Sequence, residues 1–176
     1  MRKNIVYIRG VILELTNELC FIGSEKSLQN VASLIKDAKL LLNIGSFGHS
    51  VALSMIATEE CGKALILAAV CKGKTDLDKE LQGIIFKKHV PKLYAPLLEL
   101  ALSENFVEAD VEYVKTLAPT LDKVKQRGLY VDFLKGKWVT PQDEDMKEIA
   151  KINLDYVERI YKSVEVYLNI RSDNLT

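Results

Sequence analysis

The sequence lacks the features that identify several large classes of protein. Its 24 basic and 24 acidic residues balance, so no overall positive field gathers nucleic acid, and any contact with nucleic acid needs a local patch. The three cysteines are odd in number and show no CxxC spacing, which argues against a disulfide framework and against a zinc site. There is no glycine-rich phosphate loop and no alternation of strands with helices, so a parallel sheet has no support.

Signals for export or membrane insertion are equally weak. The N-terminus has a basic start and an apolar run, but Glu14 and Glu18 interrupt the run and no small-residue cleavage site follows. The apolar stretch 51–70 contains two carboxylates and a lysine near its middle. Each of these charges would cost about 2.5–3.5 kcal/mol on insertion into a bilayer. We therefore expect a cytoplasmic protein that has no membrane partner.

The chain does contain strong helical periodicity. Apolar residues recur every three or four positions, and they make up 48% of the chain, which is enough for a sizeable core. The spacing predicts helices over 25–43, 46–71, 92–102 and 107–127, and a last helix after Pro141. Between the second and third of these, Thr75 or Asp76 can cap a further helix, with Pro91 acting as a kink or a restart. Five or six helices with short connections predict an all-α, up-and-down bundle.

The segments between these helices complete the expected fold. Residues 1–22 fit either a helix or a strand, and we assign them to an N-terminal extension of a helical domain that spans 23–176. Gly23 is expected to break the helical pattern, and Pro119 to bend or split its helix. Residues 128–141 are extended in character and predict a short irregular loop or a small hairpin before the last helix.

The second predicted helix is apolar nearly all round, except for Glu59, Glu60 and Lys63 near its centre. The two glutamates lie four and three residues before the lysine, so each pair shares one face, and His49 lies on nearly the same face as Glu60. The simpler interpretation is an ion pair within the helix, and the functional one is a polar site set into the bundle core. Gly62 favours a specific role, because glycine in mid-helix costs about 1 kcal/mol relative to alanine and often marks a close backbone approach.

Two further groups of cations follow along the chain. Lys87, Lys88, His89 and Lys92 place three ammonium groups and an imidazole within six residues, which is enough to hold a phosphate. The plainer interpretation is a solvated basic surface. Arg127 stands where a helix gives way to a loop, a position at which a cation commonly stabilises the helix C-terminus.

Three stretches occur in a specific order: GSFGHSVALSMIATEECGKALIL, KKHVPKL and KQRGLYVDFLKGKWVTP. From about Ser27 to about Asn169 the chain resembles the abortive-infection protein AbiV family, which belongs to the HEPN superfamily of helical bundles. The resemblance implies a homodimer and a role in defence against phage, with RNA, the translation machinery or a phage protein as partner. Many HEPN relatives are metal-independent ribonucleases that carry Arg, four to six residues, then His. None of the five arginines here has a histidine at that spacing.

Two functional hypotheses follow. In the first, the chain is a toxin-like, metal-independent endoribonuclease, in which the histidine acts as base or acid, a cation stabilises the charge on phosphorus, and a glutamate orients these groups. The candidate catalytic residues are His89, Lys92, Lys63, Glu59, Glu60 and Arg127. In the second, the chain is a binding module that arrests translation or senses phage without chemistry, which the missing motif and the zero net charge favour.

A metal site built from Glu59, Glu60 and His89 is a third hypothesis with less support. Di-iron bundles repeat Glu-x-x-His on two helices, and this sequence contains no Glu-x-x-His. We therefore expect no metal and no cofactor.

Overall fold

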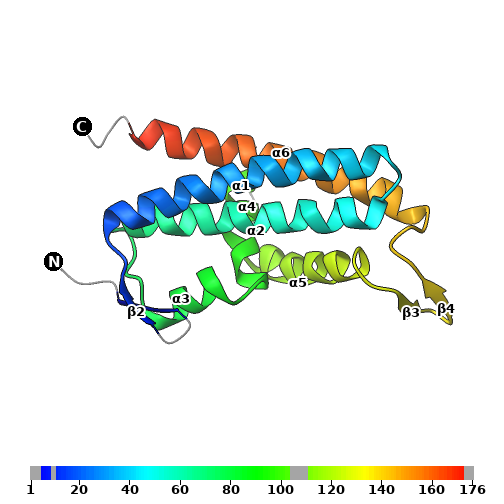
Figure 1. Ribbon diagram of the computed structural model, residues 1–176, viewed down its shortest axis with the longest axis horizontal. Coiled ribbons are helices and arrows are strands. Elements are labelled where there is room, and N and C mark those ends of the chain that lie inside the picture. The colour runs from blue at the N-terminus through cyan, green and yellow to red at the C-terminus, as the bar shows by residue number, and fades with distance from the viewer. Residues whose placement is uncertain (1–4, 9–10, 104–110, 173–176) are drawn as a thin grey trace.

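The longest helices of the described part of the chain lie side by side and form the body of the protein (Figure 1). The computed structural model describes residues 5–8, 11–103 and 111–172. Helices α1 (Asn17–Asn43) and α2 (Phe47–Cys71) run antiparallel, and α6 (Asp145–Ser172) packs against both. The expected all-α bundle is confirmed.

Helices α1 and α2 pack closely because small polar residues lie between them. The hydroxyl of Ser24 donates a hydrogen bond to the carbonyl of Ala64 at 2.9 Å, and the hydroxyl of Ser50 donates to the carbonyl of Ala38 at 2.8 Å. Gly45 forms the turn between the two helices, with a φ of 81° that favours glycine. The two helices predicted over 25–43 and 46–71 are therefore separate, as expected.

The chain before α1 forms a small antiparallel hairpin. Strand β1 (Ile5–Ile8) pairs with strand β2 (Val11–Glu14), so this part of the N-terminal extension is strand. Helix α1 then begins at Asn17, where the Thr16 hydroxyl accepts a hydrogen bond from the Leu19 amide at 3.2 Å. The last residues of the predicted extension 1–22 thus belong to the first long helix.

The predicted break at Gly23 is wrong. Helix α1 continues through this residue. Gly23 lies against α2, where a Cβ would stand 3.1 Å from Leu67 Cδ1. The glycine allows close packing of two helices and does not end one.

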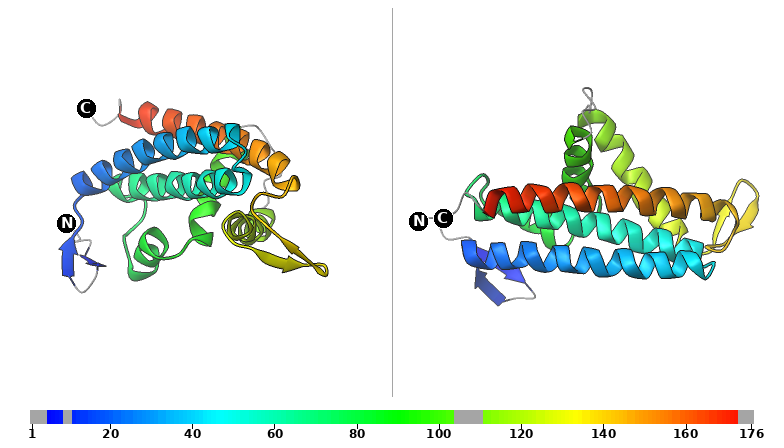
Figure 2. Two further views of the ribbon diagram at one scale, coloured as in Figure 1. Left: turned by 45° about the vertical axis from the view of Figure 1, so that its right-hand side comes forward. Right: turned by 90° about the horizontal axis from the view of Figure 1, so that it is seen from above.

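Shorter helices lie on one side of the three long ones and form a second layer (Figure 2). They are α3 (Lys79–Phe86), the 3-10 helix η1 (Val90–Leu93), α4 (Tyr94–Ser103) and α5 (Val111–Arg127). Helix α5 is one continuous helix with Pro119 inside it, so the expected split is not observed. The first residues of the predicted helix 107–127 lie outside the described residues.

Gly62 allows η1 to approach α2 very closely. A Cβ on Gly62 would lie 1.8 Å from the carbonyl oxygen of Lys92 and 3.1 Å from Pro96 Cδ. Only glycine fits such a contact. Because η1 carries Lys92 and follows directly after His89, this contact determines where both side chains lie relative to α2.

A second hairpin follows α5 and projects from the body of the molecule (Figure 2). Strands β3 (Asp132–Leu134) and β4 (Lys137–Val139) pair antiparallel, which agrees with the small hairpin predicted within 128–141. Its base is joined to the start of α2, where the amide of Gly48 donates a hydrogen bond to the carbonyl of Pro141 at 2.8 Å. A Cβ on Gly48 would lie 2.5 Å from that same oxygen, so the backbones touch.

The main core lies where α1, α2 and α6 meet the second layer. Buried residues from α1, α2, η1, α4, α5 and α6 form it, among them Val31, Cys61, Leu93, Ala118 and Val157. No described helix combines the length and the apolar character that crossing a membrane requires.

Candidate functional site

The side chain of Glu59 is buried at the junction of α2, η1 and α5, with 4% of the residue exposed. Its Oε1 accepts a hydrogen bond from Lys125 Nζ at 2.6 Å. Its Oε2 lies 2.7 Å from His89 Nδ1 and 3.9 Å from Lys92 Nζ. A lone buried carboxylate would cost several kcal/mol, and these basic partners offset that cost. We call Glu59, His89, Lys92 and Lys125 the Glu59 cluster.

His89 is the member of the Glu59 cluster that reaches solvent. Its side chain is 62% exposed, whereas the side chains of Lys92 and Lys125 are 9% and 6% exposed. When Glu59 is ionised it can only accept hydrogen bonds, so Nδ1 of His89 carries the hydrogen that faces it. In the neutral ring Nε2 then has the free lone pair, and it lies on the side away from the carboxylate. The pair therefore presents a base to solvent.

The two buried lysines are held in different electrostatic states. Burial lowers the pKa of Lys92 below its ordinary value of 10.5, and repulsion from Lys63 and Lys125 lowers it further. The negative charges of Glu59 and Glu60 act in the opposite direction but do not outweigh these effects. Burial also acts to lower the pKa of Lys125, but hydrogen bonds to Asp122 and Glu59 outweigh it and the pKa is raised. Lys125 is thus a firmly held cation, while Lys92 gives up its proton more readily than a free lysine does.

Three of the six predicted site residues come together in the Glu59 cluster: Glu59, His89 and Lys92. Glu60 and Lys63 lie on the neighbouring side of α2 and pair with each other at 3.3 Å. They line a different cleft, beside α1 and Phe86, although both still act on Lys92 electrostatically.

Arg127 and His49 do not belong to the Glu59 cluster. Arg127 forms a salt bridge with Asp145 at the start of α6. His49 hydrogen-bonds the Ser46 hydroxyl at 2.9 Å, one turn into α2. Among the described residues, no hydrogen bond or ion pair joins either side chain to Glu59. Of the candidate catalytic residues, Arg127 is thus paired at the start of α6 instead of joining Glu59 and His89.

Lys125 and its neighbour Asp122 complete the site, although neither was among the candidate catalytic residues. Asp122 Oδ1 lies 2.6 Å from Lys125 Nζ, so the lysine bridges two carboxylates. A signal for Lys125 does exist in the sequence. Along α5 it follows the buried residues Val114 and Ala118 at core spacing, so it occupies a position where an apolar residue is expected.

The structure gives no support to the metal hypothesis. Among the described residues no group of three or more His, Cys, Asp or Glu side chains is arranged to hold a metal ion. Glu59 and His89 do meet, but Glu60 is turned to Lys63 and the other partners of Glu59 are lysines, which are cations and do not bind metals when protonated.

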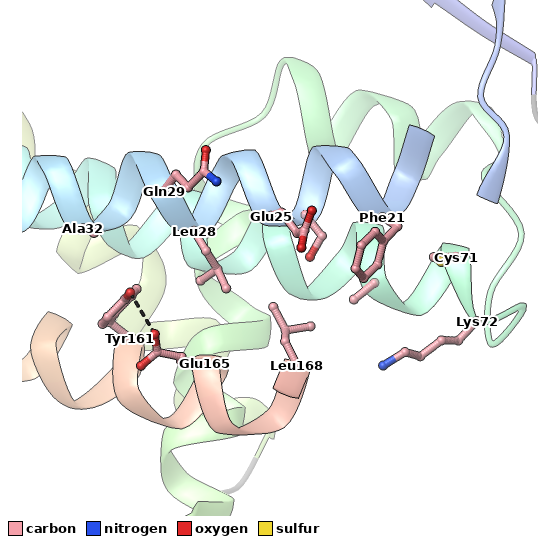
Figure 3. A pocket seen from close by; sticks show the side chains of 12 residues that line it. Phe21, Glu25, Leu28, Gln29, Ala32, Cys71, Lys72, Tyr161, Glu165 and Leu168 are labelled. Atoms are coloured by element: carbon pink, nitrogen blue, oxygen red, sulfur yellow. Dashed lines mark hydrogen bonds between the residues drawn. The ribbon is translucent and has the colours of Figure 1, made fainter. Parts of the chain in front are cut away.

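A separate cavity of about 350 Å³ opens between α1, the end of α2 and the last turns of α6 (Figure 3). Phe21, Leu28 and Leu168 line it, and the hydroxyl of Tyr161 donates a hydrogen bond to Glu165 at 3.1 Å on its wall. Burial, assisted by the nearby charge of Glu165, raises the pKa of Tyr161. None of the predicted site residues lines this cavity.

Comparison with known proteins identifies the family. A sequence model of the AbiV family, of the HEPN type, matches residues 20–162. No curated protein and no solved structure matches the chain. The matched region begins in α1 and ends within α6, so it covers the bundle with the Glu59 cluster and leaves the N-terminal hairpin outside. The chain therefore belongs to the AbiV family of abortive-infection proteins in the HEPN superfamily.

Proposed function

We propose that this AbiV-family protein acts in abortive infection by cleaving RNA without a metal ion, with His89 as the catalytic acid or base. The observation that carries the proposal is the 2.7 Å contact between the buried Glu59 carboxylate and the exposed His89 ring. A carboxylate in this position fixes the tautomer of the imidazole and stabilises the imidazolium that forms when the ring takes a proton.

The chemistry would proceed as a transfer within the RNA. His89 Nε2 removes the proton from a 2′-hydroxyl, and the 2′-oxygen attacks the adjacent phosphorus. The bond from phosphorus to the 5′-oxygen breaks, which leaves a 2′,3′-cyclic phosphate and a 5′-hydroxyl once that oxygen is protonated. Lys92, which lies beside Glu59 in the same cluster, supplies positive potential for the negative charge that develops on the phosphoryl oxygens.

The leaving 5′-oxygen needs a proton donor. Within the Glu59 cluster His89 alone is well exposed, so a second donor has to come from elsewhere. Pairing of two chains in a homodimer would bring a second His89 to the same RNA. One ring would then act as base while the other, protonated, acts as acid.

The test is cleavage of RNA by the purified protein in EDTA. The wild type is expected to generate 2′,3′-cyclic phosphate ends, and His89→Ala to lower the rate by about 100-fold or more. His49→Ala is the matched control, because it removes the other histidine of the chain from an exposed site away from Glu59. Cleavage that survives His89→Ala, or that His49→Ala also abolishes, would contradict the assignment.

Glu59 is proposed as a positioning residue, and a second variant tests that role. Glu59→Gln keeps the size of the side chain but removes the counterion of the imidazolium. The rate constant kcat should then fall while KM for RNA stays unchanged, because the ring loses its orientation but not its contact with the substrate. A fall in kcat accompanied by unfolding of the variant, measured by circular dichroism, would indicate a structural role only.

A binding module without chemistry is the second candidate function. Glu59 is satisfied by cations of the same chain, and two of these cations are buried, so the Glu59 cluster also fits a purely structural ion network. This candidate predicts a stable complex with a phage protein, a ribosomal component or RNA. It also predicts that mass spectrometry detects no RNA product after long incubation.

A further inference from the structure

A cleft of about 530 Å³ lies between α5 and the β3–β4 hairpin, away from the Glu59 cluster. Its lining combines cations, hydrogen-bonding groups and apolar surface, and includes Lys123, Arg127, Gln126, Tyr130 and Leu134. We call it the α5 cleft. It is large enough for a nucleotide-sized group.

Helix α5 separates this cleft from Glu59. Lys123 and Arg127 are four residues apart and share one face of the helix, while Lys125 lies between them on the opposite face and points to Glu59. The α5 cleft is therefore a second polar surface of the bundle, built from the other side of the same helix.

The outer face of the hairpin carries two aromatic rings. Phe133 and Trp138 are opposite each other in the β3–β4 pairing, with ring centroids 5.2 Å apart and a tilt of 59°. They are 55% and 71% exposed. Asp132 and Leu134, the neighbours of Phe133 in β3, line the α5 cleft, so the two rings point to the other side of the hairpin. Aromatic surface of this extent is unusual in contact with water alone.

The tip of the hairpin holds a cation in an unfavourable backbone conformation. Lys135 and Gly136 form the two-residue turn, with φ values of 49° and 82°. Such a turn favours asparagine, aspartate or glycine at its first position, because other residues with a Cβ adopt a positive φ reluctantly. Lys135 is exposed, so this turn places its charge in solvent at the tip of the hairpin.

The carboxylates around the cleft are engaged, whereas several cations are not. Asp132 accepts a hydrogen bond from the Phe133 amide, and Asp145 is paired with Arg127. Among the residues that the structure describes, Lys123 and Lys135 have no ion-pair partner. Lys135 therefore stands at the tip of the hairpin that carries the exposed rings, whereas Lys123 lies across the hairpin from them, in the α5 cleft.

We propose that the α5 cleft and the β3–β4 hairpin bind single-stranded RNA. Bases stack on Trp138 and Phe133, and phosphates contact Lys123, Lys135 and Lys137. An RNA strand that crosses the hairpin would meet the two rings on the hairpin's outer face and the cations of the α5 cleft on the other face. Stacking rings combined with cations bind single strands without sequence preference. The proposal rests on the proposed function for the choice of RNA, and it assigns the recognition of the strand to residues outside the Glu59 cluster.

A second copy of this chain is the main competing occupant. In a twofold contact each patch faces its own copy, so like-charged lysines of the two hairpins would be brought together. RNA instead supplies phosphates, which are anionic partners for Lys123 and Lys135. Charge complementarity therefore favours the nucleic acid.

The binding test uses Trp138, which is the only tryptophan in the chain. The probe is a single-stranded 2′-O-methyl RNA 12-mer, which cannot be cleaved by attack of a 2′-hydroxyl. Adding it to the whole protein at low salt should quench the Trp138 fluorescence, because a stacked base shields the ring. Binding should weaken as salt rises, since each phosphate contact releases counterions.

Variants are compared by the fluorescence anisotropy of a labelled 12-mer. Trp138→Ala should weaken binding by at least about fivefold, the lower end of the effect of losing one stacked base. The double variant Lys123→Ala/Lys135→Ala should reduce the slope of log K against log salt by about 1.4, or about 0.7 for each phosphate contact. Phe21→Ala, at an exposed aromatic residue of α1, and Lys36→Ala, at an exposed lysine of α1, are the matched controls and should bind normally.

The results separate this proposal from the proposed function. Binding lost in Trp138→Ala but kept in the controls Phe21→Ala and Lys36→Ala supports the α5 cleft even if no RNA is ever cleaved. Absence of 12-mer binding by the wild type, or unchanged binding by Trp138→Ala, overturns it. If Trp138→Ala binds normally but turns a dimer into a monomer in size-exclusion chromatography, the hairpin is an interface between copies and the RNA assignment fails.

Discussion

Gly62→Ala tests whether the contact between α2 and η1 determines the geometry of the Glu59 cluster. The added Cβ would stand 1.8 Å from the carbonyl oxygen of Lys92, so one backbone has to move by at least about 1.2 Å to reach the 3.0 Å that real contacts respect. Overpacking of this kind costs about 1–3 kcal/mol and more where backbone must shift. The higher helix propensity of alanine offsets about 1 kcal/mol of this loss of stability.

The expected net effect is a loss of about 2 kcal/mol in the free energy of unfolding, or about 4–8 °C in Tm for a chain of this size. Denaturation in urea, followed by circular dichroism, measures it. Movement of η1 also displaces His89 from Glu59, and an error of about 1 Å in such a contact costs about 100-fold in rate. RNA cleavage by the folded variant should therefore fall by a similar factor.

Gly83→Ala is the matched control, because it is also a glycine within a helix. There the nearest atom to a new Cβ is the flexible Lys88 Cε at 3.8 Å, so the substitution should leave stability unchanged or raise it by up to about 1 kcal/mol. If Gly62→Ala unfolds at the same urea concentration as the wild type while Gly83→Ala behaves as described, the two backbones do not touch and the reasoning fails.

Two further variants or treatments test the buried groups. Lys125→Met should cost about 3 kcal/mol near pH 7, because Glu59 loses its shortest ion pair. This loss should shrink as pH rises through the raised pKa of Lys125, above its ordinary 10.5, because the stabilisation by Lys125 is fully present only below that value. An equal loss at about pH 9 and about pH 12 would refute it. Iodoacetamide near pH 8 should alkylate native protein at Cys71 alone, because burial raises the pKa of Cys20 to about 11 and that of Cys61 to about 12. Mass spectrometry that finds Cys61 labelled in the native protein would contradict its burial.

Elements with a strong local signal are predictable from the sequence. The apolar periodicity and the glycine at 45 place α2 within a residue or two, and the run 128–141 predicts the β3–β4 hairpin. Gly23 misleads because its meaning depends on a neighbour: it permits α1 to lie against Leu67, and nothing local distinguishes that role from a helix break.

The candidate site is only half predictable, for a related reason. Glu59 and Glu60 are adjacent and chemically identical, and the choice of His89 as partner of Glu59 depends on which side of α2 the second layer covers. Lys125 is 66 residues from Glu59 in sequence, so only the docking of α5 brings them together. The one local sign of this contact is that Lys125, a polar residue, occupies a core position of the amphipathic helix α5.

The position of Glu59 also bears on how the two layers assemble. Its partners come from two separate segments, η1 with the residue before it and α5, whereas its own helix belongs to the first layer. If only one segment is docked, the carboxylate of Glu59 is partly desolvated but lacks some of its basic partners. Each segment therefore gains its full stabilisation only when the other is seated, and the second layer docks on the first as a single cooperative unit.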